Sequence, residues 1–470
     1  MTTCSTTFQA THFEQLRQHL LRGDGYEHAA YVLFKAAEIQ SDPWDREAHR
    51  KFLSTKVIPV LGEQVVESTP NLITWKTTSF IAALKEAQAT GSLLGIVHNH
   101  PAGSPNFSAQ DDENEPKLVR LAQNRDGQET PLLSFILTAD STCSGRLWTS
   151  PTYRKPMRMI RVIGDGFDFH YDGRGAGQTR AAFDRQALAL GKALNQDLSL
   201  LRIGIVGCGG TGSAVAVLLA RTGVGNLLLI DNDIVDATNL NRLHGARQAD
   251  ADAMLPKVDV VGRSISELGL GVRVAKAEAW VGDPGCRDAL RSCDIIFGCT
   301  DDHAGRMLLG RLALFYLIPV IDLGLAIQVD DGRPPKLRAL DGRVTVLLLG
   351  KTCLPCRGIA DATRASEETM RRENPEQYER LKAEAYVFGE GNPSPVVVTF
   401  TTELACMAVN EMIHRITGFR GPEGARANLV RKFHQMTDAK PGSTSKSGCM
   451  LCDNPHYWGR GDVIPFLDRS

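Results

Sequence analysis

Residues 202–220 read RIGIVGCGGTGSAVAVLLA, and this stretch decides the fold of the larger part of the chain. The apolar run RIGIV has strand length, and it is followed by a glycine-rich turn and the apolar helical segment SAVAVLLA. Gly207, Gly209 and Gly212 permit a tight turn, and the amide groups of the following helix point at a phosphate. Asp231 ends the next apolar strand, where an acid can bind ribose hydroxyls. The stretch predicts a parallel α/β sheet with a nucleotide site.

The composition limits the number of domains and the kinds of partner. A chain of 470 residues exceeds what one hydrophobic core usually supports, so two domains are expected. A net charge of -1 gives no electrostatic reason to expect nucleic acid or a membrane surface as partner. The N-terminus lacks a basic region followed by an apolar core, and glycines break the uncharged stretch 203–220. We therefore expect a cytoplasmic protein without a membrane helix.

We expect the chain to divide at residues 171–182, YDGRGAGQTRAA, which are rich in glycine and poor in large apolar residues. The first domain is then 1–170 and the second 183–470. Two further segments differ from their surroundings. Residues 361–386 are charged and predicted to be helical with exposed faces, and residues 436–448 have the composition of a linker.

The first domain contains a second motif, VHNHPAGSPNFSAQD, at residues 97–111. We predict a buried strand that ends in His98 and His100, whose side chains share one face because alternate residues of a strand do so. Asp111 can add a third ligand, which leaves one position for water, as in a catalytic zinc site. Ser108 with Asp111 also fits a capping box that starts the following helix, and the two roles are compatible.

The complete spacing of these residues resembles the JAMM metalloprotease family, over about residues 10–165. The resemblance implies a cytidine-deaminase-like α/β domain whose catalytic zinc is held by His98, His100 and Asp111, with Ser108 donating a hydrogen bond to the tetrahedral oxyanion. It also implies a glutamate as general base on an earlier strand.

Glu27 stands at the head of such a strand, whereas Glu38 is expected beyond its far end, so Glu27 is our choice. Zinc lowers the pKa of a bound water from about 16 to about 7, and Glu27 would take the proton of that water. The substrates of the family are peptide or isopeptide bonds after the C-terminal glycine of ubiquitin-like proteins.

The residues around the glycine turn resemble the ubiquitin-activating and ThiF/MoeB superfamily, over about residues 180–455. The segments DNDIVDATNLNR, LPKV and CTDD carry the resemblance. It implies a Rossmann-like domain that uses ATP and Mg²⁺ to adenylate the C-terminal glycine of a ubiquitin-like protein. The implied site residues are Gly207, Gly209 and Gly212 in the turn, Asp231 on the ribose, Asn239, Arg242 and Lys257 on the phosphates, and Asp301 on Mg²⁺.

Arg185, in FDRQ, matches an arginine of the superfamily that reaches a phosphate across a homodimer interface, so we expect a homodimer; the alternative is an ordinary surface charge. An anionic carboxylate that approaches an anionic nucleotide requires several cations, which Arg185, Arg242, Lys257 and Mg²⁺ provide. A hydride-transfer site has no such need. An NAD-dependent dehydrogenase, which the glycine turn alone also fits, is therefore the less favoured reading.

Two CxxC pairs, Cys353 with Cys356 and Cys449 with Cys452, predict one closed, structural zinc site. Two disulfides are the alternative, which a chain without an export signal disfavours. The superfamily often carries such a four-cysteine site, and the intervening segment includes a crossover loop over the substrate tail.

Superfamily members that form a thioester keep a catalytic cysteine in or near that segment, but residues 357–448 contain only Cys406. Cys406 lies in an apolar helical pattern and is expected in the core. Thr363, Ser366 and Ser394 could form an oxyester, although an unactivated hydroxyl is a weak nucleophile. Whether a covalent intermediate forms on this chain stays open.

The leading hypothesis is a bifunctional enzyme of a bacterial ubiquitin-like conjugation pathway, of the antiviral-defence type. It would activate the C-terminal glycine of a modifier, hand the modifier to a conjugating-enzyme-like acceptor, and hydrolyse bonds at the same C-terminus. The rival hypothesis is sulfur-carrier metabolism, in which the activated carrier becomes a thiocarboxylate. A third hypothesis is a non-enzymatic scaffold whose sites have decayed, and it is disfavoured because the motifs of both domains are complete.

Overall fold

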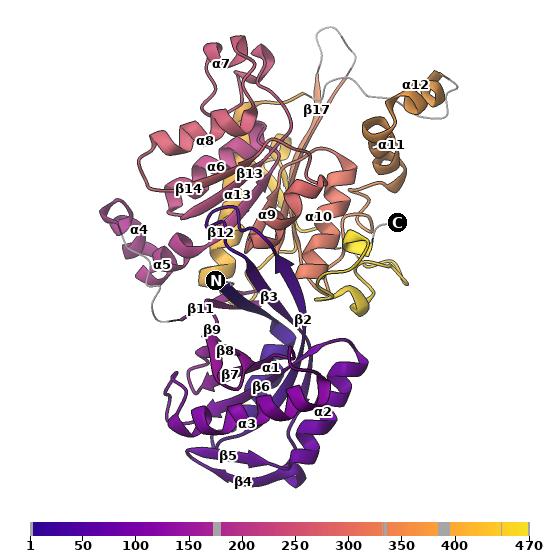
Figure 1. Ribbon diagram of the computed structural model, residues 1–470. Coiled ribbons are helices and arrows are strands. Elements are labelled where there is room, and N and C mark those ends of the chain that lie inside the picture. The colour runs from indigo at the N-terminus through magenta and orange to yellow at the C-terminus, as the bar shows by residue number, and fades with distance from the viewer. Residues whose placement is uncertain are drawn as a thin grey trace.

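The computed structural model describes residues 3–172, 180–330, 332, 336–383, 395–442 and 444–468. Within these ranges the chain forms two large β-sheets, each covered by helices on both faces, one in the N-terminal and one in the C-terminal part (Figure 1). The expected pair of α/β units is thus confirmed.

The N-terminal sheet has nine strands among the described residues, in the order β11-β10-β1-β3-β2-β6-β7-β8-β9. Helix α1 (Ala10–Leu20) packs on one face around Phe8 and Phe135, and α2 (Thr77–Ala89) and α3 (Ala109–Asp126) pack on the other. A hairpin of β4 (Val65–Thr69) and β5 (Leu72–Trp75) forms a separate small sheet. The strands of the large sheet are β1 (Thr3–Gln9), β2 (Ala29–Ile39), β3 (His49–Pro59), β6 (Leu93–His100), β7 (Leu132–Thr138), β8 (Cys143–Ser150), β9 (Tyr153–Pro156), β10 (Met159–Ile163) and β11 (Phe167–Tyr171).

Strand β6 lies between an antiparallel and a parallel neighbour, and this arrangement determines the position of the motif at residues 97–111. Ala29, the first residue of β2, lies opposite His98, and His100 lies opposite Thr138 of β7. The start of β2 and the end of β6 therefore meet at one edge of the sheet, which brings the segment around Glu27 next to the histidines.

The C-terminal sheet has eight strands among the described residues, in the order β14-β13-β12-β15-β16-β17-β18-β19. The first five of these run parallel and the last three pair antiparallel. The parallel part is the doubly wound sheet that the stretch 202–220 predicts. The strands are β12 (Arg202–Val206), β13 (Asn226–Ile230), β14 (Arg273–Ala277), β15 (Ile295–Gly298), β16 (Val320–Val329), β17 (Leu337–Leu347), β18 (Asn428–Lys432) and β19 (Thr437–Ala439).

Helices cover both faces of this sheet because the buried parallel strands are apolar on both sides. One face packs on α6 (Gly210–Thr222), α8 (Lys257–Glu267) and α13 (Val398–Thr417), and the other on α9 (Arg287–Ser292) and α10 (His303–Tyr316). The remaining helices are α4 (Asp184–Leu190), α5 (Lys192–Leu200), α7 (Gln248–Asp252), α11 (Ala362–Glu373) and α12 (Pro375–Ala383).

Several sequence expectations can be compared with these elements. The strand and helix expected within 202–220 are β12 and α6, and the charged segment forms α11 and α12. Tyr171, the first residue of the expected linker, belongs to β11, and residues 173–179 of that linker lie outside the described residues. The segment 436–448 was expected to be a linker, but it contains the short strand β19, which pairs with β18.

The two sheets are joined by a buried polar interface that the sequence did not predict. Arg161 of β10 lies 2.6 Å from Oδ1 of Asp294, whose side chain is 0% exposed. Lys51 of β3 donates to the carbonyl of Cys293, at 2.6 Å. The Nε1 group of Trp44 donates to the carbonyl of Arg273, at 3.2 Å. The contacts of Arg161 and Lys51 are buried on both sides, so the two units are packed against each other.

We expect Arg161→Met to destabilise the chain by about 3–5 kcal/mol, because it removes the arginine that directly pairs with the buried Asp294 carboxylate and leaves only the neighbouring charges of Lys51 and Arg202. Thermal unfolding of the full chain measures the effect. Arg158→Met is the matched control: Arg158 pairs with Asp45 at 3.3 Å, its side chain is 43% exposed, and such pairs contribute about 0–1 kcal/mol. Equal, small shifts for both variants would contradict the importance of the buried pair.

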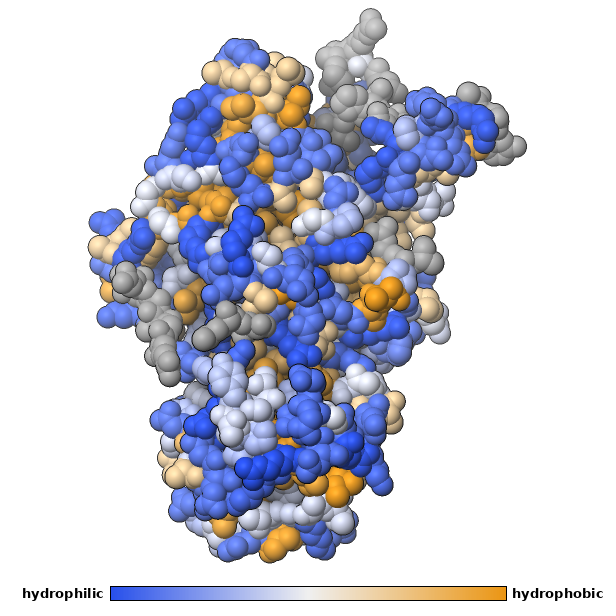
Figure 2. Space-filling model, in the orientation of Figure 1, coloured by the Kyte–Doolittle hydropathy of each residue, from blue (hydrophilic) through white to orange (hydrophobic). Residues whose placement is uncertain are grey.

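The face of the molecule in Figure 2 is mostly hydrophilic, with small and separate hydrophobic areas. A search of the described residues found no helix with the length and apolar character that a membrane crossing requires.

Candidate functional site

Two clusters of side chains among the described residues could hold a metal ion, and the first is that of His98, His100 and Asp111. The Nε2 atoms of the histidines are 3.1 Å apart, and Nε2 of His98 is 3.3 Å from Oδ1 of Asp111. Nδ1 of His100 contacts the carbonyl of Ser104 at 2.9 Å, which fixes the ring with Nε2 toward the cluster. Two imidazoles and a carboxylate with an open position fit a catalytic zinc ion.

Charges within the cluster shift the pKa values of its members. Burial raises the pKa of Asp111, but hydrogen bonds from His100 and His98 outweigh burial and bring it well below its ordinary value. Burial lowers the pKa of His100, but Asp111 and the Ser104 carbonyl outweigh it and raise the value. Asp111 is therefore ionised at neutral pH, as a metal ligand must be.

Ser108 caps α3 and lies beside the metal cluster, so the expected capping role is confirmed. Its Oγ donates to Oδ2 of Asp111 at 2.8 Å and accepts from the Asp111 amide at 3.1 Å. The Ser108 amide donates to Oδ2 of Asp111 at 2.7 Å, which together with the bond from the Asp111 amide completes the capping box expected from the sequence. The cap fixes the Asp111 carboxylate before any metal binds.

Glu27 is 6% exposed and lines the same small cavity as His98 and Asp111. Its amide donates to the carbonyl of Thr69, so the β4–β5 hairpin holds it in place. Burial raises the pKa of Glu27, which suits a group that takes a proton. The expectation that Glu38 lies beyond the end of the strand is wrong: β2 continues to Ile39, and Glu38 pairs with Arg50 far from the cluster.

Sequence reasoning missed two further residues at this cavity, Asn114 and the buried Glu115. Both follow Asp111 on α3, one turn along the helix. The acidic run DDENE directly after the motif was the available signal, because residues three and four apart share a helix face.

The glycine turn of the C-terminal sheet has the close packing that a phosphate-binding turn requires. Gly207 has φ +90°, and a Cβ there would lie 2.8 Å from the carbonyl carbon of Cys299. A Cβ at Gly212 would lie 1.7 Å from the Gly207 oxygen, so only glycine allows the helix to start there. A Cβ at Gly209 would meet nothing within 4 Å, so the space on that side is open for a ligand.

Asp231 and Lys257 lie beside this turn. The Asp231 carboxylate accepts from the amides of Cys208, at 2.5 Å, and Asp233, at 2.8 Å. Burial raises its pKa, although Lys257 acts in the opposite direction. Lys257 is the first residue of α8, and its Nζ lies 2.6 Å from Oδ2 of Asp233.

Asn239 and Arg242 cover the turn from the following segment. The Oδ1 atom of Asn239 is buried without a hydrogen-bond partner among the described residues. A Cβ on Gly210 would lie 3.3 Å from the side chain of Arg242, so this arginine extends across the start of α6. Arg242 places a cation at a helix N-terminus, which fits the phosphates of a nucleotide, whereas the unpaired Oδ1 of Asn239 can only accept a hydrogen bond.

The neighbouring Asp301 and Asp302 have different environments. Asp302 caps α10, since its carboxylate accepts from the Gly305 amide at 2.5 Å. Asp301 is exposed, and no described residue is found to donate a hydrogen bond to its carboxylate. Of the two carboxylates, that of Asp301 is therefore the one not used as a helix cap.

The structure does not bring Arg185 to the glycine turn of its own chain. Arg185 is exposed on α4, and its neighbour Phe183 packs against Gly223, just after the end of α6. The turn lies at the other end of α6, which is about 20 Å long for its 13 residues. Arg185 therefore lies at the end of α6 that is remote from the glycine turn of its own chain.

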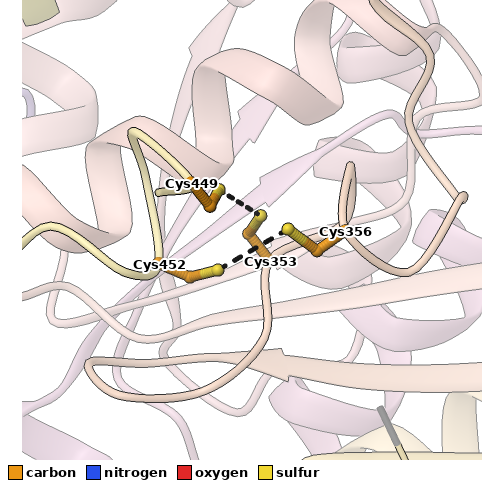
Figure 3. Close-up of side chains that lie close together, drawn as sticks. All are labelled: Cys353, Cys356, Cys449 and Cys452. Carbon is orange, nitrogen blue, oxygen red and sulfur yellow. Dashed lines mark hydrogen bonds between the residues drawn. The ribbon is translucent and has the colours of Figure 1, made fainter. Parts of the chain in front are cut away.

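The second metal cluster consists of the four cysteines of the CxxC pairs (Figure 3). Cys353 and Cys449 have Sγ atoms 3.7 Å apart, and Cys452 and Cys356 have theirs 3.8 Å apart. A disulfide requires about 2.05 Å, whereas thiolates around one tetrahedral zinc ion at about 2.3 Å are about 3.8 Å apart. The distances favour a structural zinc site over two disulfides.

We expect Cys356→Ser to lose one zinc ion per chain and to loosen the C-terminal segment, which the cluster holds against Leu314 of α10. Metal analysis and limited proteolysis of the full chain measure both effects. Cys406→Ser is the control, because Cys406 lies outside the cluster. Unchanged zinc content in Cys356→Ser would remove the structural-zinc interpretation.

Cys406 lies on α13 and is half-buried, so it is less enclosed than expected for a core residue. Burial raises its pKa, which disfavours the thiolate.

The other candidate nucleophiles lie elsewhere. Cys208 belongs to the glycine turn and is buried, and Cys299, which packs against Gly207, is half-buried. Thr363 and Ser366 lie on α11, and Ser366 donates to the Ala362 carbonyl. Ser394 lies outside the described residues.

Comparison with known proteins identifies two families along the chain. Residues 183–450 match the ThiF family, and residues 9–150 match the prokaryotic homologs of the JAB domain. The first match includes the glycine turn and both CxxC pairs except Cys452. The second includes Glu27, His98, His100, Ser108 and Asp111.

Curated relatives match the C-terminal part. Molybdopterin-synthase adenylyltransferase of Escherichia coli strain K12 is 30% identical over 159 residues, which are 33% of this chain and 57% of the relative. The SAMP-activating enzyme E1 of Haloferax volcanii is 30% identical over 120 residues, 26% of this chain and 44% of the relative. The chain thus spans about half the length of these relatives.

Among solved structures, E. coli MccB with ATP is similar at a TM-score of 0.44 and 19% identity, with 58% of this chain and 75% of that chain covered. The ThiF match covers more than half of the sequence. This chain belongs to the ThiF family and carries, N-terminal to its ThiF segment, a prokaryotic homolog of the JAB domain.

Proposed function

We propose that this chain is a bifunctional enzyme that acts at the C-terminus of a ubiquitin-like protein. The C-terminal unit adenylates the terminal glycine with ATP and Mg²⁺, and the N-terminal unit hydrolyses peptide or isopeptide bonds at that glycine. The observation that carries the proposal is that one chain holds both the cation-lined glycine turn and the His98, His100 and Asp111 cluster. The junction of the two units lies within residues 171–182, after β11.

In the adenylation step, the substrate carboxylate must approach the α-phosphate although both are anionic. Lys257 and Arg242 lie at the turn where the phosphates would bind, and Asp301 is free to hold Mg²⁺. Arg185 would add a further cation from a second copy, so we propose a homodimer. These charges stabilise the negative transition state.

In the peptidase step, Glu27 takes a proton from the water whose oxygen attacks the scissile carbonyl, and passes that proton to the amine as the C–N bond breaks. The Ser108 hydroxyl, which donates to Asp111 in the structure, would turn to donate to the oxyanion. A zinc ion held by His98, His100 and Asp111 would supply a hydroxide at neutral pH. Glu27, His98 and Asp111 line one cavity, so the base and two of the metal ligands face the same space.

The test is ATP–pyrophosphate exchange with the small protein that co-purifies with the full chain. We expect exchange to require ATP, Mg²⁺ and the terminal glycine of that protein. Tight NAD binding without pyrophosphate exchange would favour the alternative hypothesis of an NAD-dependent dehydrogenase. The match to the ThiF family gives no support to that hypothesis. The same protein extended by a short C-terminal peptide is the peptidase substrate.

One observation also supports the sulfur-carrier alternative. Residues 357–448 contain no cysteine except Cys406, and a sulfur carrier can be released from the adenylate without a thioester on the enzyme. A conjugating-enzyme-like partner that receives the modifier would favour conjugation, of the bacterial defence type proposed from the sequence. A sulfur donor that gives a thiocarboxylate would favour the alternative.

We expect Cys406→Ala to keep full pyrophosphate exchange and full transfer of the modifier, because the adenylate is already reactive and the Cys406 thiol is protonated. Non-reducing gels of the chain with ATP and the modifier provide the measurement. A thiol-sensitive adduct that disappears in Cys406→Ala would show that α13 presents a nucleophile.

A further inference from the structure

Arg146 is a charged residue in the middle of strand β8, and its side chain is only 5% exposed. Its Nε lies 2.8 Å from Oε2 of Glu115, and its Nη1 lies 2.5 Å from Oδ1 of Asp112. Its Cζ lies 3.7 Å from the ring centroid of Phe107 and 5.1 Å from that of Trp148. One guanidinium thus contacts two carboxylates and two rings.

These contacts enclose the metal-binding segment. Phe107 directly precedes Ser108, and Asp112 directly follows Asp111. The same guanidinium therefore holds both ends of the segment that contains the oxyanion donor and the third metal ligand. Earlier in the same loop, between His100 and Phe107, the Ser104 carbonyl contacts Nδ1 of His100 and holds the start of the loop in place.

Glu115 anchors this arrangement to the sheet. Its Oε1 accepts from Ser134 of β7 at 2.6 Å, and its Oε2 accepts from Nε1 of Trp148 at 2.5 Å as well as from Arg146. The Nη2 group of Arg146 is buried without a partner among the described residues. The two carboxylates and the Phe107 ring therefore determine the orientation of the guanidinium, at the expense of one unsatisfied donor.

We propose that Arg146 is a positioning residue that fixes segment 107–112 and thereby sets the Asp111 carboxylate against His98 and His100. The inference rests on the proposed peptidase function of the N-terminal unit. A planar guanidinium can contact both carboxylates and stack on the ring at once, which a lysine ammonium cannot. Groups that orient metal ligands typically change metal affinity or activity by about 10–100-fold when they are replaced.

The experiment measures Zn²⁺ affinity of the full chain by competition with a chromophoric chelator. His98→Ala removes a ligand of this site only, so the zinc ion that this variant fails to bind is the one at His98, and the ion that remains is the one at the four cysteines. We expect Arg146→Lys to lower the zinc affinity of the His98 site by about 10–100-fold and to leave the affinity of the four-cysteine site unchanged. In the peptidase assay, kcat should fall while KM stays, because the variant disturbs the ligands and leaves the substrate surface intact.

Arg154→Lys is the matched control. Arg154 contacts the other oxygen of Asp112 at 2.8 Å and lies over the same Trp148 ring, but its side chain is 45% exposed. We expect this variant to change zinc affinity by less than about threefold, as for an exposed ion pair. If Arg146→Lys fails to fold, Phe107→Leu decides the question, because it removes the stacked ring without leaving a buried charge unpaired.

Two failures can be distinguished. If the unaltered chain and His98→Ala bind the same number of zinc ions, the proposed peptidase function fails and this inference fails with it. If the unaltered chain binds zinc at His98 and Phe107→Leu or a folded Arg146→Lys binds it as tightly, with unchanged kcat, only the inference fails. Arg146 would then be a structural ion pair.

Discussion

Glu27→Gln is expected to lose peptidase activity by about 10²–10⁴-fold while the chain keeps both zinc ions. The substitution preserves the size of the side chain and removes only its ability to take a proton. Glu27 is buried beside the metal cluster, and its amide is bonded to Thr69, so glutamine can occupy the same position. The measurement is cleavage of the C-terminally extended modifier, together with zinc content.

Glu38→Gln is the control for this result. Glu38 lies on the same strand, β2, at the end opposite the metal cluster, and it pairs with Arg50 at the surface. We expect full activity in this variant. A fully active Glu27→Gln enzyme would exclude Glu27 as the base, and full activity after EDTA has removed the metal would exclude a metalloprotease.

The second large effect is expected at the nucleotide site, where Asp301→Ala should lower pyrophosphate exchange by about 10²–10³-fold. Asp301 is the exposed aspartate at the end of β15, whereas the adjacent Asp302 is used as the cap of α10. The fold should stay intact because the cap is retained. If the substitution acts by weakening Mg²⁺ binding, a higher Mg²⁺ concentration should partly restore the pyrophosphate exchange of Asp301→Asn.

Glu267→Gln serves as the control, because Glu267 is the last residue of α8 and lies in exposed contacts with Arg247 and Arg263. Its exchange rate should equal that of the unaltered chain. Unchanged exchange in Asp301→Ala would show that a different residue holds the metal. Peptidase activity should persist in Asp301→Ala, since the two sites lie on different sheets.

The local motifs of both units could be predicted from the sequence because each depends on residues close together in the chain. The strand, turn and helix at 202–220 follow from an apolar run, spaced glycines and a second apolar run. His98 and His100 share a face because they are two residues apart on a strand, and the box of Ser108 and Asp111 is a local cap. Short-range geometry determines such features.

Other features depend on segments far apart in the chain, and only the tertiary structure decided them. Arg161 meets Asp294 across the two sheets, and Gly461 of the C-terminal segment lies so close to the Ala36 carbonyl that a Cβ would approach to 2.3 Å. Arg146 contacts the metal-binding segment from a neighbouring strand. Such contacts result from the shape and charge of packed surfaces, which no periodic pattern encodes.

The position of Arg185 shows the same distinction. Its match to the superfamily could be found in the sequence, but its distance from the turn depends on how α4 packs at the end of α6. The sequence by itself determined the local motifs and the residues proposed for the chemistry, because both depend on short spacings along the chain. The tertiary structure decided which of them can meet within one copy of the chain, because packing, and not spacing along the chain, sets the distances between segments.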